Sequence, residues 1–408
     1  MSKTETPSIR FRGFEDAWEQ RKLGEMGQTY TGLSGKTKDD FGHGQARFVT
    51  YMNVFSNPIS NPEMTEPIEI DPKQNEVEVG DVFFTTSSET PEEVGMSSIL
   101  LEKRGKTYLN SFCFGFRPSE KIDSYYLAYM LRSEPTRAKI ILLAQGISRY
   151  NISKNKVMEI AVSLPSLDEQ KMIGQYFSQL DNLITLHQRK VEKLTNVKKS
   201  MLEKMFPQNG SSYPEIRFKG FTDLWEQRKF GEITSKYEDP VPTPHDGYYR
   251  LGIRSHAKGT FHSYVAKGQE LETAQMHRVA AGNFIVNITF GWEHAVAITD
   301  KNDAGKLVSH RFPQFSFAEG MVPEFFRYVI VDEKFRHHLW LASPGGAGRN
   351  RVLKLDEMLN YLMRFPSRDE QIKIAEFFRQ LDNLITLHQR ELEKLQSIKK
   401  ALLEKMFV

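Results

Sequence analysis

The sequence predicts an α+β protein in which two α/β globules alternate with two long, repeated α-helices that pair as an antiparallel coiled coil on a pseudo-two-fold plan. Three observations predict this arrangement. A 43-residue segment that starts at Leu164 recurs at Phe365, without a gap and with 28 identical positions. Both copies carry apolar residues at alternating steps of three and four, which is the spacing of a coiled-coil seam. The segment before each copy alternates short apolar runs with turn residues, which is typical of strands.

The repeated segment is predicted to be helical along almost its whole length. Each copy opens with a capping box, because Ser166 and Ser367 are each followed three residues later by a glutamate. In such a box the serine oxygen accepts from an N–H of the first turn, and the glutamate reaches back to the N–H of the capping residue. At 1.5 Å per residue, the helix from Asp168 to Phe206 would span about 58 Å. The seam comprises Ile173, Phe177, Leu180, Ile184, Val191, Leu194, Met201 and Met205 in the first copy, and Ile374, Phe378, Leu381, Ile385, Leu392, Leu395, Leu402 and Met406 in the second.

Four polar residues interrupt the seam at equivalent places in the two copies: His187, Lys198, His388 and Lys399. Two interpretations stay open. The side chains can lie at the edge of the seam with their charged ends in water. Alternatively, they are polar register markers that fix how the two helices align.

A second repeated pair precedes the globules, at residues 7–26 and 214–233. Trp18 and Trp225 lie in these lead-ins and are expected to anchor them to a core. The offset between the lead-ins is 207 residues against 201 for the helices, so the segment between them is six residues shorter in the second half. We expect the first globule with its lead-in at 1–163, the first helix at 164–207, a linker and the second globule at 208–364, and the second helix at 365–408.

Each globule is expected to contain strands followed by helical segments. In the first half the strands are predicted at 77–86, 97–103 and 110–118, and one or two helices at 125–145. In the second half the strands are predicted at 278–289, 293–299 and 311–320, and the segment 324–342 is predicted to be helical.

The composition argues against several classes of protein. Of 408 residues only Cys113 is a cysteine, which excludes a disulfide framework and a cysteine-based metal site. The start of the chain does not resemble a signal peptide, and we find no apolar run of membrane-spanning length, so we expect a cytoplasmic protein without membrane contact. No phosphate loop, catalytic triad or metal-ligand spacing is found. We therefore expect no catalytic residue and no metal in this chain. The net charge of +3 permits nucleic-acid binding without requiring it.

The strongest candidates for binding are polar loops that occur at similar places in both halves. Arginine can bind guanine, asparagine can bind adenine, and lysine and backbone N–H groups can bind phosphates. One set follows the predicted strands and another precedes each long helix. The candidate residues are Thr85, Thr86, Ser87, Ser88, Arg149, Tyr150, Asn151, Ser153 and Lys154 in the first half, and Arg254, Asn287, Thr289, Arg349, Asn350, Arg351 and Lys354 in the second.

The organisation resembles the DNA-specificity (S) subunit of Type I restriction–modification systems. The segments that carry the resemblance are the L/F-P-S-x-D-E-Q starts at Leu164 and Phe365, the helices that follow them, and the G-D-V-F-F-T and G-I-S-R-Y-N-I-S segments of the first half. The second half departs from the family pattern in both of the last two segments, which weakens the transfer of individual residues to it. The resemblance covers essentially the whole chain.

The resemblance implies a non-catalytic subunit of a host-defence complex that acts on double-stranded DNA. Each globule would be a target-recognition domain for one half of a bipartite asymmetric sequence, and the helices would set the unrecognised gap. Two copies of a methyltransferase subunit would supply S-adenosylmethionine-dependent adenine methylation, and a restriction/translocase subunit would use ATP and Mg²⁺. Apolar residues left over from the seam would form the docking faces, namely Leu183, Leu186, Leu384 and Leu387; the alternative is their burial within the helix pair.

Two other functional classes remain open from the sequence alone. A coiled-coil adaptor that joins two partners would show no salt-sensitive binding to duplex DNA. An enzyme with an unrecognised site in one globule, such as a nuclease, would show metal-dependent cleavage by the isolated chain.

Overall fold

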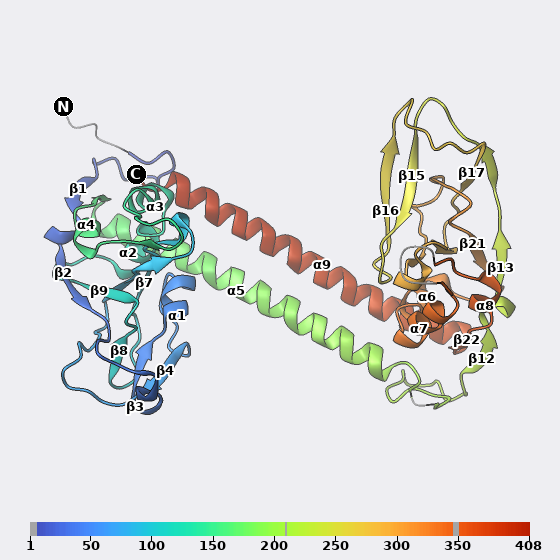
Figure 1. Ribbon diagram of the computed structural model, residues 1–408, viewed down its shortest axis with the longest axis horizontal. Coiled ribbons are helices and arrows are strands. Elements are labelled where there is room, and N and C mark those ends of the chain that lie inside the picture. The colour runs from blue at the N-terminus through green and yellow to red at the C-terminus, as the bar shows by residue number, and fades with distance from the viewer. Residues whose placement is uncertain (1–5, 209, 346–350) are drawn as a thin grey trace. The chain divides into compact units, whose positions relative to one another are not determined.

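The structure is a computed structural model that describes residues 6–208, 210–345 and 351–408, and it confirms the α+β class (Figure 1). The chain forms two compact units. Unit 1 comprises Met1–Arg189 and His388–Val408, and unit 2 comprises Lys190–Leu387. Each unit therefore contains the first part of one long helix and the last part of the other. The two long helices are α5 (Leu167–Lys204) and α9 (Arg368–Lys405), with 38 residues each.

Unit 1 is built on a four-stranded antiparallel sheet in the order β2-β9-β5-β7. A three-stranded sheet, β4-β3-β8, extends from it, and the lead-in strand β1 pairs with β11 directly before α5. The strands are β1 (Glu19–Lys22), β2 (Gly27–Thr31), β3 (Phe41–Val49), β4 (Thr65–Ile68), β5 (Val82–Thr85), β6 (Ser87–Ser88), β7 (Ser97–Ile99), β8 (Thr107–Leu109), β9 (Cys113–Pro118), β10 (Tyr150–Asn151) and β11 (Ala161–Leu164).

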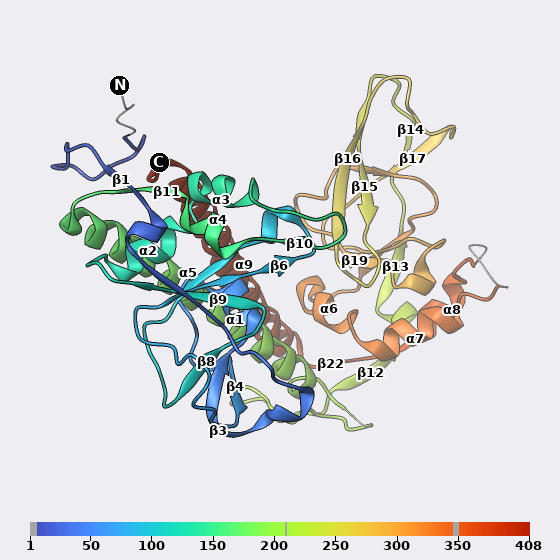
Figure 2. The same cartoon turned by 60° about the vertical axis from the view of Figure 1, so that its left-hand side comes forward.

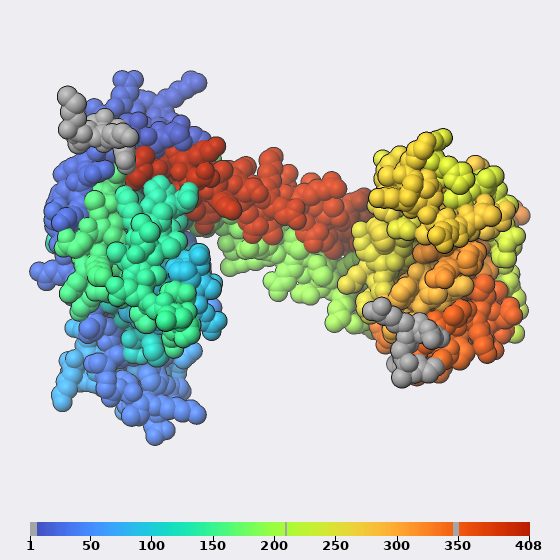
Figure 3. Space-filling model, turned by 45° about the horizontal axis from the view of Figure 1, so that its top comes forward, coloured from blue at the N-terminus to red at the C-terminus, as the bar shows by residue number. Residues whose placement is uncertain are grey.

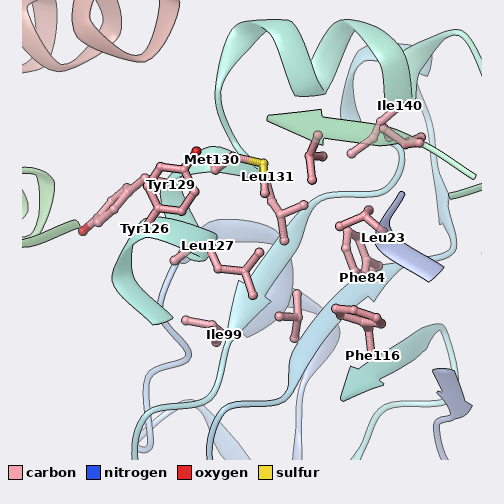
Figure 4. Close-up of a cluster of buried hydrophobic side chains, with 14 of the residues drawn as sticks. Leu23, Phe84, Ile99, Phe116, Tyr126, Leu127, Tyr129, Met130, Leu131 and Ile140 are labelled. Carbon is pink, nitrogen blue, oxygen red and sulfur yellow. The ribbon is translucent and has the colours of Figure 1, made fainter. Parts of the chain in front are cut away.

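The core of unit 1 lies between the four-stranded sheet and its helices. These are α1 (Tyr51–Ser56), α2 (Ser124–Met130), α3 (Glu134–Ile141), α4 (Lys154–Met158) and the first part of α5. Figure 4 shows Tyr126, Leu127 and Met130 of α2 together with the sheet residues Phe84 and Phe116 of the same cluster, and all five side chains are buried. Trp18 is buried in the same cluster, as the sequence predicted for the lead-in.

Unit 2 repeats this framework. Its four-stranded sheet has the order β13-β21-β18-β19, which matches unit 1 strand for strand, and β12 pairs with β22 before α9 as β1 pairs with β11. The second sheet differs, because it has five strands in the order β14-β17-β20-β15-β16. The strands are β12 (Glu226–Lys229), β13 (Thr234–Tyr237), β14 (Pro240–Pro242), β15 (Tyr248–Ile253), β16 (Thr260–Val265), β17 (Gln275–Arg278), β18 (Phe284–Val286), β19 (Val296–Ile298), β20 (Leu307–Val308), β21 (Gln314–Phe317) and β22 (Leu362–Phe365).

The segment 324–342, predicted to be helical, contains two helices, α6 (Pro323–Val329) and α7 (Glu333–Leu341). Asp332 separates them with an extended backbone, and its side chain accepts from the N–H of Lys334 as the N-cap of α7. The adjacent β-branched residues Val329, Ile330 and Val331 weaken helical continuation there. In the described part of the chain, the remaining helix of unit 2 is α8 (Leu355–Leu359), and five short 3₁₀ helices occur at Leu23–Glu25, Lys38–Asp40, Pro91–Glu93, Phe230–Glu232 and Gly291–Glu293.

The long helices run antiparallel within each unit. In unit 1, Asp181 of α5 pairs with Lys399 of α9, and six residues further along α5 His187 faces His388, with 3.3 Å between their Nδ1 atoms. In unit 2, Lys198 of α5 pairs with Asp382 of α9. All four polar interruptions of the seam therefore make contacts across the helix pair, which supports their interpretation as register markers.

The end of each long helix completes the core of the other half's globule. In unit 1, Phe407 is 3% exposed and packs on Tyr126 and Phe177. In unit 2, Phe206 packs on Trp225 and Phe325. Figure 3 shows the end of α9, in red, against the N-terminal lead-in, in blue, where the N–H of Ile9 donates to the carbonyl oxygen of Lys405.

The capping boxes are only partly as predicted. The Ser166 hydroxyl accepts from the N–H of Glu169 at 3.4 Å, but the Glu169 carboxylate accepts from the Arg10 guanidinium instead of reaching back to the cap. Glu370 binds Arg217 in the same way. A bidentate, charge-assisted pair with arginine is stronger than a hydrogen bond to one backbone N–H, which accounts for the difference.

Candidate nucleic-acid interface

In unit 1 the structure brings together the two candidate loops that the sequence predicted separately. The short strands β6 and β10 pair, with Ser88 opposite Tyr150 and Ser87 opposite Asn151. The backbone N–H of Ile152 then donates to the carbonyl oxygen of Thr86 at 2.9 Å. Figure 2 shows β6 and β10 side by side in unit 1. Segments that are about sixty residues apart in the sequence therefore form one polar edge.

The loop at 145–151 is closed by its own backbone. Gln145 and Asn151 exchange two backbone hydrogen bonds of 2.9 and 2.8 Å. Gly146 has a φ of 144°, and a Cβ there would lie 2.0 Å from the carbonyl oxygen of Arg149, so the loop requires glycine at this position. The exposed Arg149 guanidinium lies 5.8 Å from the ring centroid of Phe112. This contact restrains an arginine at the surface, where its five donors can bind a base edge or a phosphate.

The unit 1 candidates differ in their exposure. Arg149, Asn151 and Ser153 are exposed, whereas Thr86, Tyr150 and Lys154 are half-buried. The remaining three, Thr85, Ser87 and Ser88, are buried and bonded within the unit. The Thr85 hydroxyl accepts from the N–H of Met96 at 3.0 Å, the carbonyl oxygen of Ser87 accepts from the Tyr51 hydroxyl at 2.6 Å, and the Ser88 hydroxyl donates to the carbonyl oxygen of Thr90. These three residues shape the edge, and the exposed ones offer groups to a ligand.

Unit 2 has the equivalent backbone contact between its two candidate loops, with different side chains. We call this contact between the two loops of a unit the crossing. The N–H of Leu353 donates to the carbonyl oxygen of Ile288 at 2.8 Å, as Ile152 donates to Thr86 in unit 1. Asn287 and Thr289 flank this carbonyl, and the Asn287 Oδ1 atom accepts from the Thr289 hydroxyl at 2.7 Å. Lys354 is exposed at the start of α8. The candidates Arg349 and Asn350 lie outside the described residues.

Arg351 is held by aromatic rings, as Arg149 is in unit 1. Its guanidinium lies 5.8 Å from the ring centroid of Trp292 and 5.2 Å from that of Trp340. The Trp292 Nε1 atom donates to the carbonyl oxygen of Thr289, which ties this aromatic group to the crossing. Both units therefore present an arginine that is restrained by cation–π contacts beside the edge.

A cavity of about 650 Å³ lies beside Asn287 and Thr289 in unit 2. Its lining combines the cations Arg250 and Arg311 with the aromatic Phe290 and the acidic Glu293, which accepts from the Ser255 hydroxyl at 2.7 Å. Arg254 is the exposed neighbour of Ser255, and its guanidinium lies 5.3 Å from the ring centroid of Phe261 in the cavity wall. Donors, acceptors and aromatic surface in one concavity suit contact with base edges better than contact with phosphates alone.

Several residues of this surface escaped the sequence analysis. Phe112 is 53% exposed although it directly precedes the buried Cys113, and Trp340 is half exposed on α7. An alternating strand pattern would place Phe112 on the same face as the buried Phe114 and Phe116, so the sequence gives no signal that it is exposed. Trp340 and Arg311 also carry no signal, because only the fold places them beside Arg351 and Asn287.

The four leucines proposed as docking faces are exposed. Leu183 and Leu186 in unit 1 are 46% and 47% exposed, and Leu384 and Leu387 in unit 2 are 44% and 52% exposed. Their side chains are therefore not buried between α5 and α9. In unit 1, Met172 and Tyr176 extend the apolar surface of α5 at helical spacing, which the sequence analysis missed because it counted only the seam.

Among the described residues, no group of three or more histidine, cysteine or acidic side chains is placed to hold a metal ion. Burial raises the pKa of the Cys113 thiol, so it is a packed apolar residue rather than a reactive thiolate. Within the same part of the chain, no helix combines the length and the apolar character needed to cross a membrane.

Comparison with known proteins agrees with this architecture. Residues 15–196 match the family model of the Type I restriction modification DNA specificity domain. The chain is 25% identical over 323 residues to the MjaVIII specificity subunit of a type I restriction enzyme from Methanocaldococcus jannaschii, covering 75% of this chain and 74% of that protein. A protein of the same organism named for the specificity subunit of the enzyme MjaX is 22% identical over 405 residues, covering 95% of this chain and 92% of that protein.

Two solved structures share the fold. The S subunit of a Type I restriction-modification system from M. genitalium aligns with a TM-score of 0.61 at 13% identity, over 99% of both chains. A chain from a study of complex assembly and conformational transition of the type I R-M system aligns with a TM-score of 0.50 at 13% identity, over 96% of this chain and 97% of that one. At this identity the likeness shows the fold and no more.

Proposed function

We propose that the chain is a DNA specificity subunit of a Type I restriction–modification system, which its similarity to that family supports, and that it recognises one bipartite, asymmetric DNA sequence, with one half-site bound by each unit. The observation that carries the proposal is the matched backbone crossing. The same framework positions Thr86 and Ile152 in unit 1, and Ile288 and Leu353 in unit 2. The exposed side chains around the crossing differ, so two different half-sites are expected.

The chemistry of the two surfaces supports recognition of bases in addition to phosphates. Arg149 and Asn151 in unit 1 are both exposed in the loop that the backbone pair of Gln145 and Asn151 closes. In unit 2, Asn287 and Thr289 line the cavity, where Arg250 and Arg311 add cations, and Arg351 lies over the ring of Trp292. Arginine and asparagine are the side chains that form bidentate contacts with guanine and adenine. The lysines Lys154 and Lys354 would neutralise phosphates, so binding should weaken steeply as salt is added.

The proposed partners follow from the duplication. Two exposed leucine pairs at equivalent places on near-identical helices would offer two equivalent docking faces, and hence bind two copies of one methyltransferase subunit. In this proposal the chain itself is not an enzyme. The methyltransferase partner binds S-adenosylmethionine and methylates adenine, and a restriction/translocase subunit binds ATP and Mg²⁺. The long helices set the gap between the half-sites.

The first test is methylome sequencing in a host that lacks DNA modification and expresses the chain with its methyltransferase subunit. We expect one bipartite motif with methylated adenine in both halves. In the variant Arg149→Ala with Asn151→Ala, specificity should relax in one half only, because each lost base contact costs about 1–3 kcal/mol. The control Arg104→Ala removes an exposed arginine that pairs with Glu63 and Glu102, and it should leave the motif unchanged.

The adaptor alternative predicts a different result. The exposed leucines would then join two partners, and a stable complex would form without any methylated motif. A complex that methylates no bipartite sequence would therefore contradict DNA recognition by this chain.

A further inference from the structure

In unit 1, three residues from three different elements meet where the globule contacts the long helices. The Tyr129 hydroxyl of α2 donates to the Asp181 Oδ2 atom of α5 at 2.9 Å. The Lys399 Nζ atom of α9 lies 2.5 Å from the Asp181 Oδ1 atom, and 5.5 Å from the ring centroid of Tyr129. The aspartate thus joins the globule and both helices in one contact.

Unit 2 contains the same arrangement. The Tyr328 hydroxyl of α6 donates to the Asp382 Oδ2 atom of α9 at 3.0 Å, and the Lys198 Nζ atom of α5 lies 2.6 Å from the Asp382 Oδ1 atom. Lys198 also lies 5.9 Å from the ring centroid of Tyr328. Asp382 and Lys399 are the repeats of Asp181 and Lys198, so each contact combines the aspartate of one repeat with the lysine of the other. We call these two groups the joint triads.

Both triads lie where a long helix leaves its globule. In unit 1 the last buried residue of α5 is Ile184, three residues after Asp181. In unit 2 the last buried residue of α9 is Leu381, directly before Asp382. Each triad therefore lies close to the end of the buried part of the helix that carries its aspartate.

The triads add direction to a contact that is otherwise apolar. Next to Asp181, Tyr129 stacks on Phe177, and Tyr328 packs on Phe378 in unit 2. Such apolar contacts stabilise the joint, but the hydrophobic effect is not directional. A carboxylate that accepts from a phenol and from an ammonium group has a defined geometry. Burial and the neighbouring aspartate raise the pKa of both tyrosines, so both phenols stay protonated donors.

We propose that the joint triads are positioning residues that fix the orientation of each globule on the helix pair, and that they thereby sharpen the discrimination between DNA targets with the correct gap and targets with a wrong one. This inference rests on the proposed function. It also gives Lys198 and Lys399, which interrupt the seam, a role in specificity.

The physical requirement is that a joint must resist the deformation that a wrong gap demands. One additional base pair moves a half-site by about 3.4 Å and rotates it by about 34°. Both half-sites can then be contacted only if the protein or the DNA deforms. The free-energy cost of that deformation is what discriminates against a target with the wrong gap. A softer joint lowers this cost for the wrong gap and leaves the correct gap nearly unaffected.

The test measures methylation by the complete complex on duplexes that carry both half-sites and a gap of n, n − 1 or n + 1 base pairs. In the double variant Asp181→Asn with Asp382→Asn, the ratio of the rate at n to the rate at n ± 1 should fall about tenfold, and about threefold for each single variant, as expected for partly exposed ion pairs. The half-site sequences should not change. The charge swap Asp181→Lys with Lys399→Asp restores the ion pair and should recover part of the ratio.

Two controls separate positioning from folding. Asp168→Asn removes an exposed carboxylate of the same helix, 3.2 Å from Lys171, and should leave the ratio unchanged. Tyr129→Phe with Tyr328→Phe keeps the ring packing and removes only the hydroxyl hydrogen bonds, so it tests the triads even if the aspartate variants fold poorly. An unchanged ratio in the folded Asn and Phe variants would overturn the inference. If the unmodified complex methylates no bipartite motif, the proposed function fails instead.

Discussion

At the position where unit 1 has Gly95, unit 2 has His294, and the two residues have φ values of 64° and 62°. A left-handed backbone is easy for glycine and uncommon for histidine. In unit 2 the tertiary structure stabilises it, because His294 is 3% exposed and its Nε2 atom lies 2.7 Å from the carbonyl oxygen of Ile330. Burial lowers the pKa of His294, and the hydrogen bond opposes this only in part.

This single histidine should make unit 2 sensitive to acid. Its pKa is lower in the folded state than the ordinary value of about 6.5, so the unfolded state binds more protons between these two values. The free energy of unfolding should therefore fall as the pH drops below about 6.5. Urea unfolding at about pH 7.5 and about pH 5.5 measures the loss, which should shrink in His294→Asn, since asparagine tolerates this backbone without titrating there. His245→Asn, at an exposed position, should keep the loss; an equal loss in both variants would exclude His294 as its source.

Sequence reasoning proposed the candidate loops but could not predict which of their side chains are exposed and which are buried. Ser87 and Asn151 both belong to the predicted loops, yet pairing of β6 with β10 leaves Ser87 buried and Asn151 exposed. This pairing is a long-range contact, and no local pattern predicts it. Trp340 and Phe112 were missed for the same reason, since their roles come from the arginines that the fold brings to them.

At the scale of elements, the lead-in of each half is clamped to the start of its long helix. Arg10 donates from two nitrogen atoms to the Glu169 carboxylate at 2.7 and 2.8 Å, and Arg217 donates to Glu370 at 2.7 Å through both contacts. Both glutamate side chains are 1% exposed and both arginine side chains 14%. The repetition of these residues was visible in the sequence. Their pairing was not, because S-x-x-E also suits a capping box.

The clamps should contribute equally to the two units. Glu169→Gln leaves a mostly buried guanidinium without its counter-charge, and we expect a loss of about 2 kcal/mol in the free energy of unfolding of unit 1. Glu370→Gln should cost unit 2 about the same amount, because the geometry is the same. Urea unfolding followed by probes in each unit measures both. The control Glu159→Gln, which removes the exposed partner of Lys22, should have little effect; a loss of similar size there would mean that general charge effects dominate.

At the scale of the whole molecule, duplication explains why each unit contains parts of both helices. The sequence predicted two equal helices in antiparallel pairing, because a gapless repeat with a heptad seam needs a partner of the same length and pattern. It could not predict that each unit takes up the end of the other half's helix. Phe206 and Phe407 are the same residue of the repeat, and only the tertiary structure places Phe407 against Tyr126 and Phe206 against Trp225.

This exchange of helix ends predicts which unit loses stability when either helix end is substituted. Phe407→Ala removes a ring that is 3% exposed in unit 1, so the globule encoded in the first half of the chain should lose about 3 kcal/mol or more of stability. Phe206→Ala should instead destabilise unit 2, and by less, because its ring is only partly buried. Amide hydrogen exchange distinguishes the two cases: Phe407→Ala should lower the protection of β5 and β9, and Phe206→Ala that of β18 and β21. If Phe407→Ala lowered protection in β18 and β21 while β5 and β9 kept theirs, each helix would complete its own half of the chain, and the assembly of the units from both repeats would be wrong.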